Sequence, residues 1–129
     1  MKEAKVLLVD DAEAFTSNMS RLLSRRGYDV MAVNDGESAI KAVEENDFDV
    51  VLLDMKMPGM HGLTALKEMK KRRPSIEVII LSAYGTVDLA VDGMHLGAFD
   101  YVVKPAEFEE LQTKIDEAYQ HKLNREDKS

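Results

Sequence analysis

Five short apolar runs, separated by segments with helical periodicity, restrict the fold of this 129-residue chain more than any other feature. Three of the runs are continuous, at residues 6–9, 50–53 and 78–81. A strand without polar alternation is one that is covered on both faces, as happens in a parallel sheet between two layers of helices. The runs at residues 28–33 and 101–103 are interrupted or shorter, which is typical of edge strands.

The segments between the runs place apolar residues on one side of a helix and end at turn-forming residues. In the last of them the apolar positions are Phe108, Leu111, Ile115, Ala118 and Tyr119. Gly27 is a helix stop, and Asp35 and Thr86 are suitable N-caps. Five alternating strands and helices with right-handed crossovers predict an α/β fold, a doubly wound five-stranded parallel sheet of order 2-1-3-4-5 in a flavodoxin-like three-layer sandwich.

Length and composition favour a single domain over residues 1–123, followed by a polar tail or the start of a linker at 124–129. The chain has no cysteine, which excludes disulfides and thiolate metal sites and suits a cytoplasmic protein. Its first apolar run is too short for a signal peptide or a membrane span. A net charge of −7 argues against direct contact with nucleic acid.

Polar side chains follow four of the five predicted strands, in the order Asp10, Asp11, Asp54, Ser82 and Lys104. Since the carboxyl ends of parallel strands share one edge of the sheet, we expect these groups to converge. Carboxylates 4 Å apart repel by about 4 kcal/mol at an effective dielectric of about 20, so either they take up protons or a cation joins them. Ligands that are all oxygen suit Mg²⁺ or Mn²⁺. A carboxylate beside such an ion can accept a phosphoryl group, with an ammonium and a hydroxyl stabilising the transferred oxygens.

Four sequence segments, in this order and spacing, resemble the receiver domains of two-component response regulators. They are VDD at 9–11, LDMKMPGM at 53–60, LSA at 81–83 and YVVKP at 101–105. The resemblance extends over residues 4–122, and the segment GAFDY at 97–101 is similar to receivers of the nitrogen-regulatory transcription-factor type.

The resemblance implies that Asp54 is the phosphoacceptor. It also implies a metal site in which Asp11 binds Mg²⁺ directly, Asp10 binds it largely through water, and Asp54 and the backbone carbonyl of Lys56 complete the protein ligands. The phosphoryl donor implied is a sensor histidine kinase or a histidine phosphotransfer protein. Such a protein catalyses only its own phosphotransfer and autodephosphorylation, so it is not an enzyme in the usual sense.

The resemblance further implies that Ser82 donates to one phosphoryl oxygen, that Lys104 pairs with another, and that Tyr101 turns inward as part of a switch. Lys104–Pro105 is expected to be a cis peptide. Phosphorylation is then expected to alter the surface made by the fourth helix, fifth strand and fifth helix. That surface would bind a second copy of the chain or a target protein.

Three details go beyond the family pattern. His61 stands where an acidic or amide residue is common, which predicts a weaker helix N-cap. Lys56 and Tyr84, each two residues past a site residue, are expected to shield the phosphoryl group from water. His61, His95 and His121 have no ligand spacing among themselves and are expected at the surface or rim.

The same positions allow other interpretations. Each polar residue alone suits a cap or a solvated side chain, but such roles would have to coincide at four strand ends. A magnesium phosphatase of the haloacid-dehalogenase kind resembles a different pattern, Asp-x-Asp, whereas Lys56 stands two residues after Asp54. A flavodoxin-like cofactor binder would need a phosphate-binding loop after the first strand, where the chain instead has acidic residues.

Overall fold

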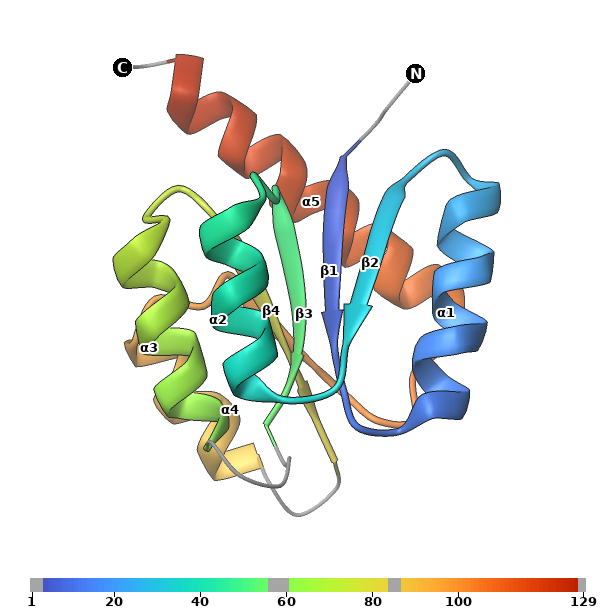
Figure 1. The fold of residues 1–129 in the computed structure, drawn as a ribbon, viewed down its shortest axis with the longest axis horizontal. Helices are drawn as coiled ribbons and strands as arrows, with labels where there is room; N and C mark the ends of the chain where they lie inside the picture. The colour runs from blue at the N-terminus through green and yellow to red at the C-terminus, as the bar shows by residue number, and fades with distance from the viewer. Residues whose placement is uncertain (1–3, 56–60, 84–86, 128–129) are drawn as a thin grey trace.

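The computed structural model describes residues 4–55, 61–83 and 87–127, and it confirms the predicted topology. Its five parallel strands lie in the order β2-β1-β3-β4-β5 (Figure 1). The strands are β1 Lys5–Val9, β2 Asp29–Val33, β3 Val50–Asp54, β4 Glu77–Ser82 and β5 Asp100–Val103. The helices are α1 Glu13–Arg25, α2 Gly36–Glu45, α3 Gly62–Arg72, α4 Val87–His95 and α5 Phe108–Asp127.

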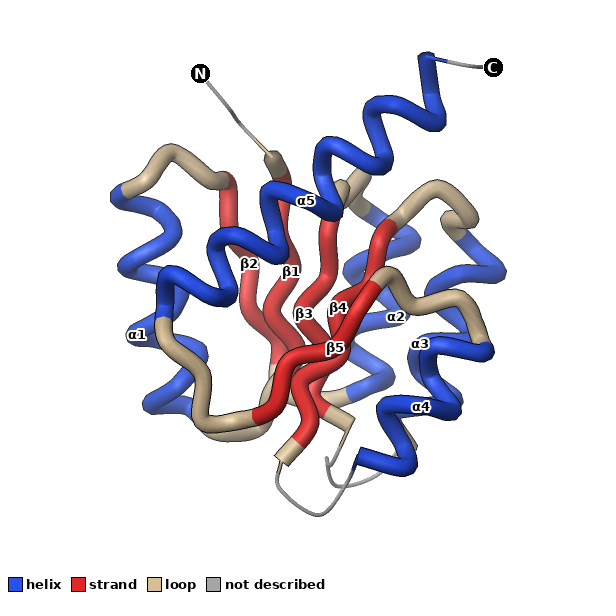
Figure 2. Tube along the Cα trace, turned by 180° about the vertical axis from the view of Figure 1, so that it is seen from behind, coloured by secondary structure: helices blue, strands red, loops and turns tan. Residues whose placement is uncertain are grey.

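Helices cover both faces of the sheet, with α1 and α5 on one face and α2, α3 and α4 on the other (Figures 1 and 2). Successive strand residues point to opposite layers. In β1, Leu7 and Val9 pack with the α2–α4 layer, whereas Val6 and Leu8 pack with α1 and α5. All residues of β3 and β4 are buried, while Met31 on β2 keeps 40% of its surface exposed. The prediction of buried inner strands and half-exposed edges is therefore confirmed.

Local signals in the sequence explain where the helices begin and end. The Asp35 carboxylate accepts a hydrogen bond from the backbone N–H of Ser38 at 2.8 Å, as an N-cap does. Gly27 has a φ of 95°, which a side chain disfavours and which lets the chain turn out of α1. His61 caps α3 through its ring, with Nδ1 3.2 Å from the Leu63 amide nitrogen. His61 therefore does cap α3, and the expected weakness of this cap stays a prediction.

The segment expected to be a polar tail or the start of a linker, residues 124–129, continues α5 as far as Asp127, and its role as a tail or linker stays a prediction. Arg125 helps to explain the helix there, because its Nη2 lies 2.9 Å from the Glu77 carboxylate and donates to the Ser75 carbonyl at 2.9 Å. These contacts anchor the end of α5, which crosses the sheet diagonally, to the start of β4 (Figure 2).

His121, expected at the surface or rim, is exposed over about half of its side chain. Its Nδ1 lies 2.6 Å from the buried Glu77 carboxylate, and its ring lies against Phe99 with centroids 5.2 Å apart. His121 thus joins α5 to β4 at the end of the sheet opposite the predicted site. Among the described helices, none combines the length and apolar character needed to cross a bilayer.

Tyr28, just before β2, contacts α5 and makes the free energy of unfolding depend on pH in the alkaline range. The Tyr28 hydroxyl donates to Asp116, and burial together with this bond raises the pKa of Tyr28 from 10.0 to about 12. Because the folded pKa is the higher one, the contribution is complete below about pH 10 and is lost as the pH rises through 12. We expect the difference in free energy of unfolding between wild type and Tyr28→Phe to be constant below about pH 9 and to shrink by about pH 11. Urea titrations at several pH values measure it, and a difference independent of pH would contradict this reading.

Candidate functional site

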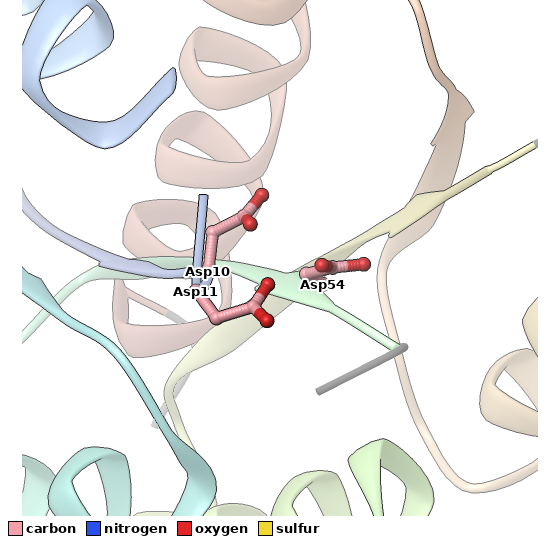
Figure 3. A group of neighbouring side chains, drawn as sticks. All are labelled: Asp10, Asp11 and Asp54. Carbon is pink, nitrogen blue, oxygen red and sulfur yellow. The ribbon is translucent and has the colours of Figure 1, made fainter. Parts of the chain in front are cut away.

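The carboxyl ends of β1 and β3 meet at the centre of the sheet. Val9 is in register with Leu53, so the residues that follow, Asp10 and Asp54, emerge side by side. Asp10, Asp11 and Asp54 each place one carboxylate oxygen within 4.8 Å of the others (Figure 3). The predicted convergence of three acidic side chains is thus a property of the structure.

The three carboxylates differ in their contact with solvent. Asp10 is fully buried, Asp54 keeps 6% of its surface exposed, and Asp11 is exposed. In Figure 3 the Asp11 and Asp10 side chains extend from the end of β1 toward the space beside Asp54. Asp11 is therefore the member of the cluster in contact with solvent, whereas Asp10 and Asp54 are buried.

Lys104 brings a positive charge into this cluster from β5. Its ammonium nitrogen lies 2.6 Å from Asp10 Oδ2 and 3.8 Å from Asp54 Oδ2. The Lys104 amide donates to the Ser82 carbonyl at 2.8 Å, and the Lys104–Pro105 peptide is cis, as expected. The sequence placed Lys104 at this edge, but it gave no sign of the direct pair with Asp10.

Asp10 also makes a local contact with the backbone, although α1 has no side-chain cap at its N-cap residue, Ala12. The second oxygen of Asp10, Oδ1, accepts a hydrogen bond from the Ala12 amide at 2.9 Å, just before α1 begins. Both oxygens of this buried carboxylate therefore have partners. One orders the start of α1 and the other holds the Lys104 ammonium.

Ser82 and Tyr101 occupy different parts of the sheet. Ser82 ends β4 at the acidic edge; its buried hydroxyl donates to the Ala83 carbonyl at 3.4 Å, a long bond. Tyr101 pairs with Ile80 further back in β5, and its half-buried ring packs against the α2–α4 layer. The structure does not bring Tyr101 to the carboxylates, and its role as a switch stays a prediction.

Two of the predicted site residues, Lys56 and Tyr84, lie outside the described residues, as does the proposed cap Thr86. The Lys56 carbonyl ligand and the shielding of the phosphoryl group thus stay predictions. Phe15 is a residue that the sequence did not single out. Its ring centroid lies 4.7 Å from the Lys104 ammonium, and its helical spacing alone marks it only as part of the core.

This arrangement suits phosphoryl transfer to a carboxylate. It combines a nucleophilic carboxylate, two further acids of the kind that hold a hard cation, and an ammonium within 4 Å of the nucleophile. The acidic chain after β1 differs from the anion-binding loop of a flavin protein.

Comparison with known proteins agrees with this chemistry. A family profile described as the response regulator receiver domain matches residues 6–116. The chain is 41% identical over 120 residues to the transcriptional regulatory protein ZraR of Klebsiella oxytoca and 38% identical over 122 residues to the response regulator FleR of Pseudomonas aeruginosa. These matches cover 93% and 95% of this chain but only 27% and 25% of those proteins, so the chain spans about a quarter of their length.

Solved structures show the same similarity. A receiver domain from Clostridium thermocellum superposes with a TM-score of 0.88 at 36% identity, covering 92% of this chain and 96% of that one. NtrX from Brucella abortus, crystallised with ADP, gives a TM-score of 0.91 at 30% identity over 97% of this chain and 29% of its own. The haloacid-dehalogenase alternative finds no support in these matches. With the profile covering most of the chain and the fold and acidic edge in agreement, this chain belongs to the receiver-domain family of two-component response regulators.

Proposed function

We propose that this receiver accepts a phosphoryl group on Asp54 from the histidine of a sensor kinase or phosphotransfer protein, in a reaction that requires Mg²⁺ or Mn²⁺. One observation supports the proposal above the others. Three carboxylate oxygens lie within 4.8 Å of one another, with the Lys104 ammonium 3.8 Å from Asp54. Acidic side chains so close together favour binding of a cation, and the cation and the ammonium are the groups that stabilise negative charge on transferred phosphoryl oxygens.

The donor set fits a small, hard cation. Ligands of one Mg²⁺ lie at about 2.1 Å from it, so two of them are at most about 4.2 Å apart. The carboxylate oxygens lie within 4.8 Å of one another, so a small shift of the side chains or a bridging water would be enough for them to share one ion. Asp11 and Asp54 would bind it directly, Asp10 largely through water, and the Lys56 carbonyl would complete the site. When bound, the ion neutralises charge on the transferring phosphoryl oxygens.

The transfer exchanges one bond to phosphorus for another. An Asp54 carboxylate oxygen attacks the phosphorus, the P–N bond to the donor imidazole breaks, and the imidazole leaves with the electron pair and takes up a proton. Lys104 and Ser82 each stabilise an oxygen of the new acyl phosphate. Water later cleaves that phosphate, so the protein turns over only its own modification and acts as a switch.

The output of the switch is the α4-β5-α5 surface. Val91 and Met94 on α4 and Val103 on β5 are 44%, 37% and 39% exposed there. Moving a two-state surface from 1:99 to 99:1 requires about 5.5 kcal/mol of preference for the active state. A dianion held by Lys104, Ser82 and a metal provides contacts absent from the unmodified state. We infer a cytoplasmic signalling role with a second copy or a target protein as partner, and no direct contact with nucleic acid.

Acetyl phosphate with Mg²⁺, followed by intact mass measurement, tests the proposal. Wild type should gain one phosphoryl group and Asp54→Asn should gain none. Asp47→Asn is a matched control, because this aspartate is 79% exposed and lies between α2 and β3, at the other end of β3. It should be phosphorylated like wild type. Full incorporation into Asp54→Asn would refute the assignment.

A further inference from the structure

We propose that Phe15 is a positioning residue for the phosphoryl transfer, holding the Lys104 ammonium beside Asp54 through the face of its ring. This inference deepens the proposed function and rests on it. It concerns a side chain that makes no contact with the phosphoryl group and acts only through Lys104.

Three groups surround the ammonium. Lys104 Nζ lies 2.6 Å from Asp10 Oδ2, 3.8 Å from Asp54 Oδ2 and 4.7 Å from the Phe15 ring centroid. The Lys104 side chain is only 23% exposed, so water screens these interactions weakly. A cation within about 6 Å of a ring face is attracted by the negative face of the ring.

The position of the Phe15 ring is fixed from two directions. Asp10 Oδ1 binds the Ala12 amide, and the Thr16 amide donates to the Ala12 carbonyl at 3.1 Å, so the first turn of α1 is ordered around Phe15. The half-buried ring also packs against the core that lies between the sheet and the layer formed by α1 and α5. Asp10 therefore contacts both the start of the helix that bears the ring and the ammonium that the ring faces.

An aromatic ring suits this place better than another carboxylate. A carboxylate would hold the ammonium more tightly, but it would repel an incoming phosphoryl dianion. The ring attracts the cation without adding a net charge, so Lys104 stays within reach of Asp54 and remains able to pair with a phosphoryl oxygen. Phe15 would thus limit the Lys104 side chain to conformations in which the ammonium already lies near the phosphoryl group.

Fluorinated phenylalanines at position 15 separate this role from packing, since fluorine weakens the ring's attraction for a cation with little change in shape. The phosphorylation rate with acetyl phosphate and saturating Mg²⁺ should fall stepwise from phenylalanine to the trifluoro analogue, by about two- to tenfold in total. Phe15→Leu should be as slow as the trifluoro protein, and Phe15→Trp at least as fast as wild type. In a Lys104→Met background the fluorine series should be flat.

Phe108 provides the matched control. It is a half-buried phenylalanine of the same layer with a cation, the Arg26 guanidinium, 5.0 Å from its centroid. The same fluorine series at Phe108 should leave the rate unchanged. A flat series at Phe15 in folded protein would overturn the inference while leaving Asp54 as the acceptor.

Nuclear magnetic resonance reads the contact without any reaction. The Lys104 side-chain methylene protons next to the ammonium should be shifted upfield by the ring in wild type and should return toward ordinary values in Phe15→Leu. If no variant is phosphorylated, the proposed function fails, and these shifts alone then judge the contact. Ordinary shifts in wild type would overturn it.

Discussion

Replacement of Lys104 by methionine is expected to raise the affinity for Mg²⁺ tenfold or more. The Lys104 ammonium lies 2.6 Å from Asp10 and 3.8 Å from Asp54, so its positive charge is close to the carboxylates that would bind the ion. A unit charge and a divalent ion about 5 Å apart repel by about 7 kcal/mol at an effective dielectric of about 20. Even a fifth of this repulsion corresponds to a factor of about ten in the dissociation constant. Isothermal titration of metal into the two proteins measures the change.

The same variant should be less stable without metal, and Mg²⁺ should reverse the loss. Asp10 is fully buried, and leaving a buried carboxylate without its cation costs about 3 kcal/mol. An ion that binds only the folded state then restores stability in proportion to the logarithm of its concentration. Urea unfolding in EDTA and in Mg²⁺ reads both effects.

Lys114→Met is the matched control for Lys104→Met. Its ammonium lies 2.7 Å from Asp100, at the start of β5, whereas Lys104 follows the end of that strand. Both side chains of this control pair are 30% exposed. We expect a loss below about 1 kcal/mol and no change in metal affinity. An unchanged or weaker affinity in Lys104→Met would show that lysine and metal do not share the site.

Removal of both basic residues that contact Glu77 is the second large effect expected. Glu77 is only 3% exposed, and its Oε2 lies 2.6 Å from His121 Nδ1 and 2.9 Å from Arg125 Nη2. Either residue alone still contacts the buried carboxylate, so His121→Ala and Arg125→Ala should each cost about 1 kcal/mol. The double variant removes both direct contacts of the buried carboxylate and leaves only its electrostatic interaction with the Lys70 ammonium. We expect a loss of about 3 kcal/mol in the free energy of unfolding.

The substitution Glu77→Gln provides the control for this cycle. In the Glu77→Gln background no charge is buried, so the double substitution of His121 and Arg125 should cost about 1 kcal/mol or less. Denaturant unfolding of all the variants gives the coupling directly. Equal losses in the wild-type and Glu77→Gln backgrounds would mean that the end of α5 is held by packing instead of charge.

The end of α5 shows what the sequence cannot supply. Residues 124–127 are polar, and their helical state depends on contacts such as that between Arg125 and Glu77, 48 positions away. By contrast, the strands could be predicted because continuous apolar runs report burial on both faces directly. The order of the strands followed from the shorter, interrupted runs of β2 and β5, which marked them as edges.

At the candidate site, topology explains what was predictable. Parallel strands bring Asp10, Asp54 and Lys104 to one edge whatever their spacing in the chain, and the structure places them there. The direct pairing of Lys104 with Asp10 and its contact with Phe15 depend on side-chain orientations that a pattern of residue types does not encode. A phenylalanine at helical spacing is typical of a core, and only the three-dimensional structure shows a cation against its face.

Location of the modification tests the central claim most directly. Protein treated with acetyl phosphate in the presence or absence of Mg²⁺ is reduced with borohydride, which converts an aspartyl phosphate to homoserine, and its peptides are weighed. The account predicts homoserine at position 54 alone, and only when the metal was present. Homoserine at another aspartate, or at position 54 to the same extent in EDTA, would contradict it.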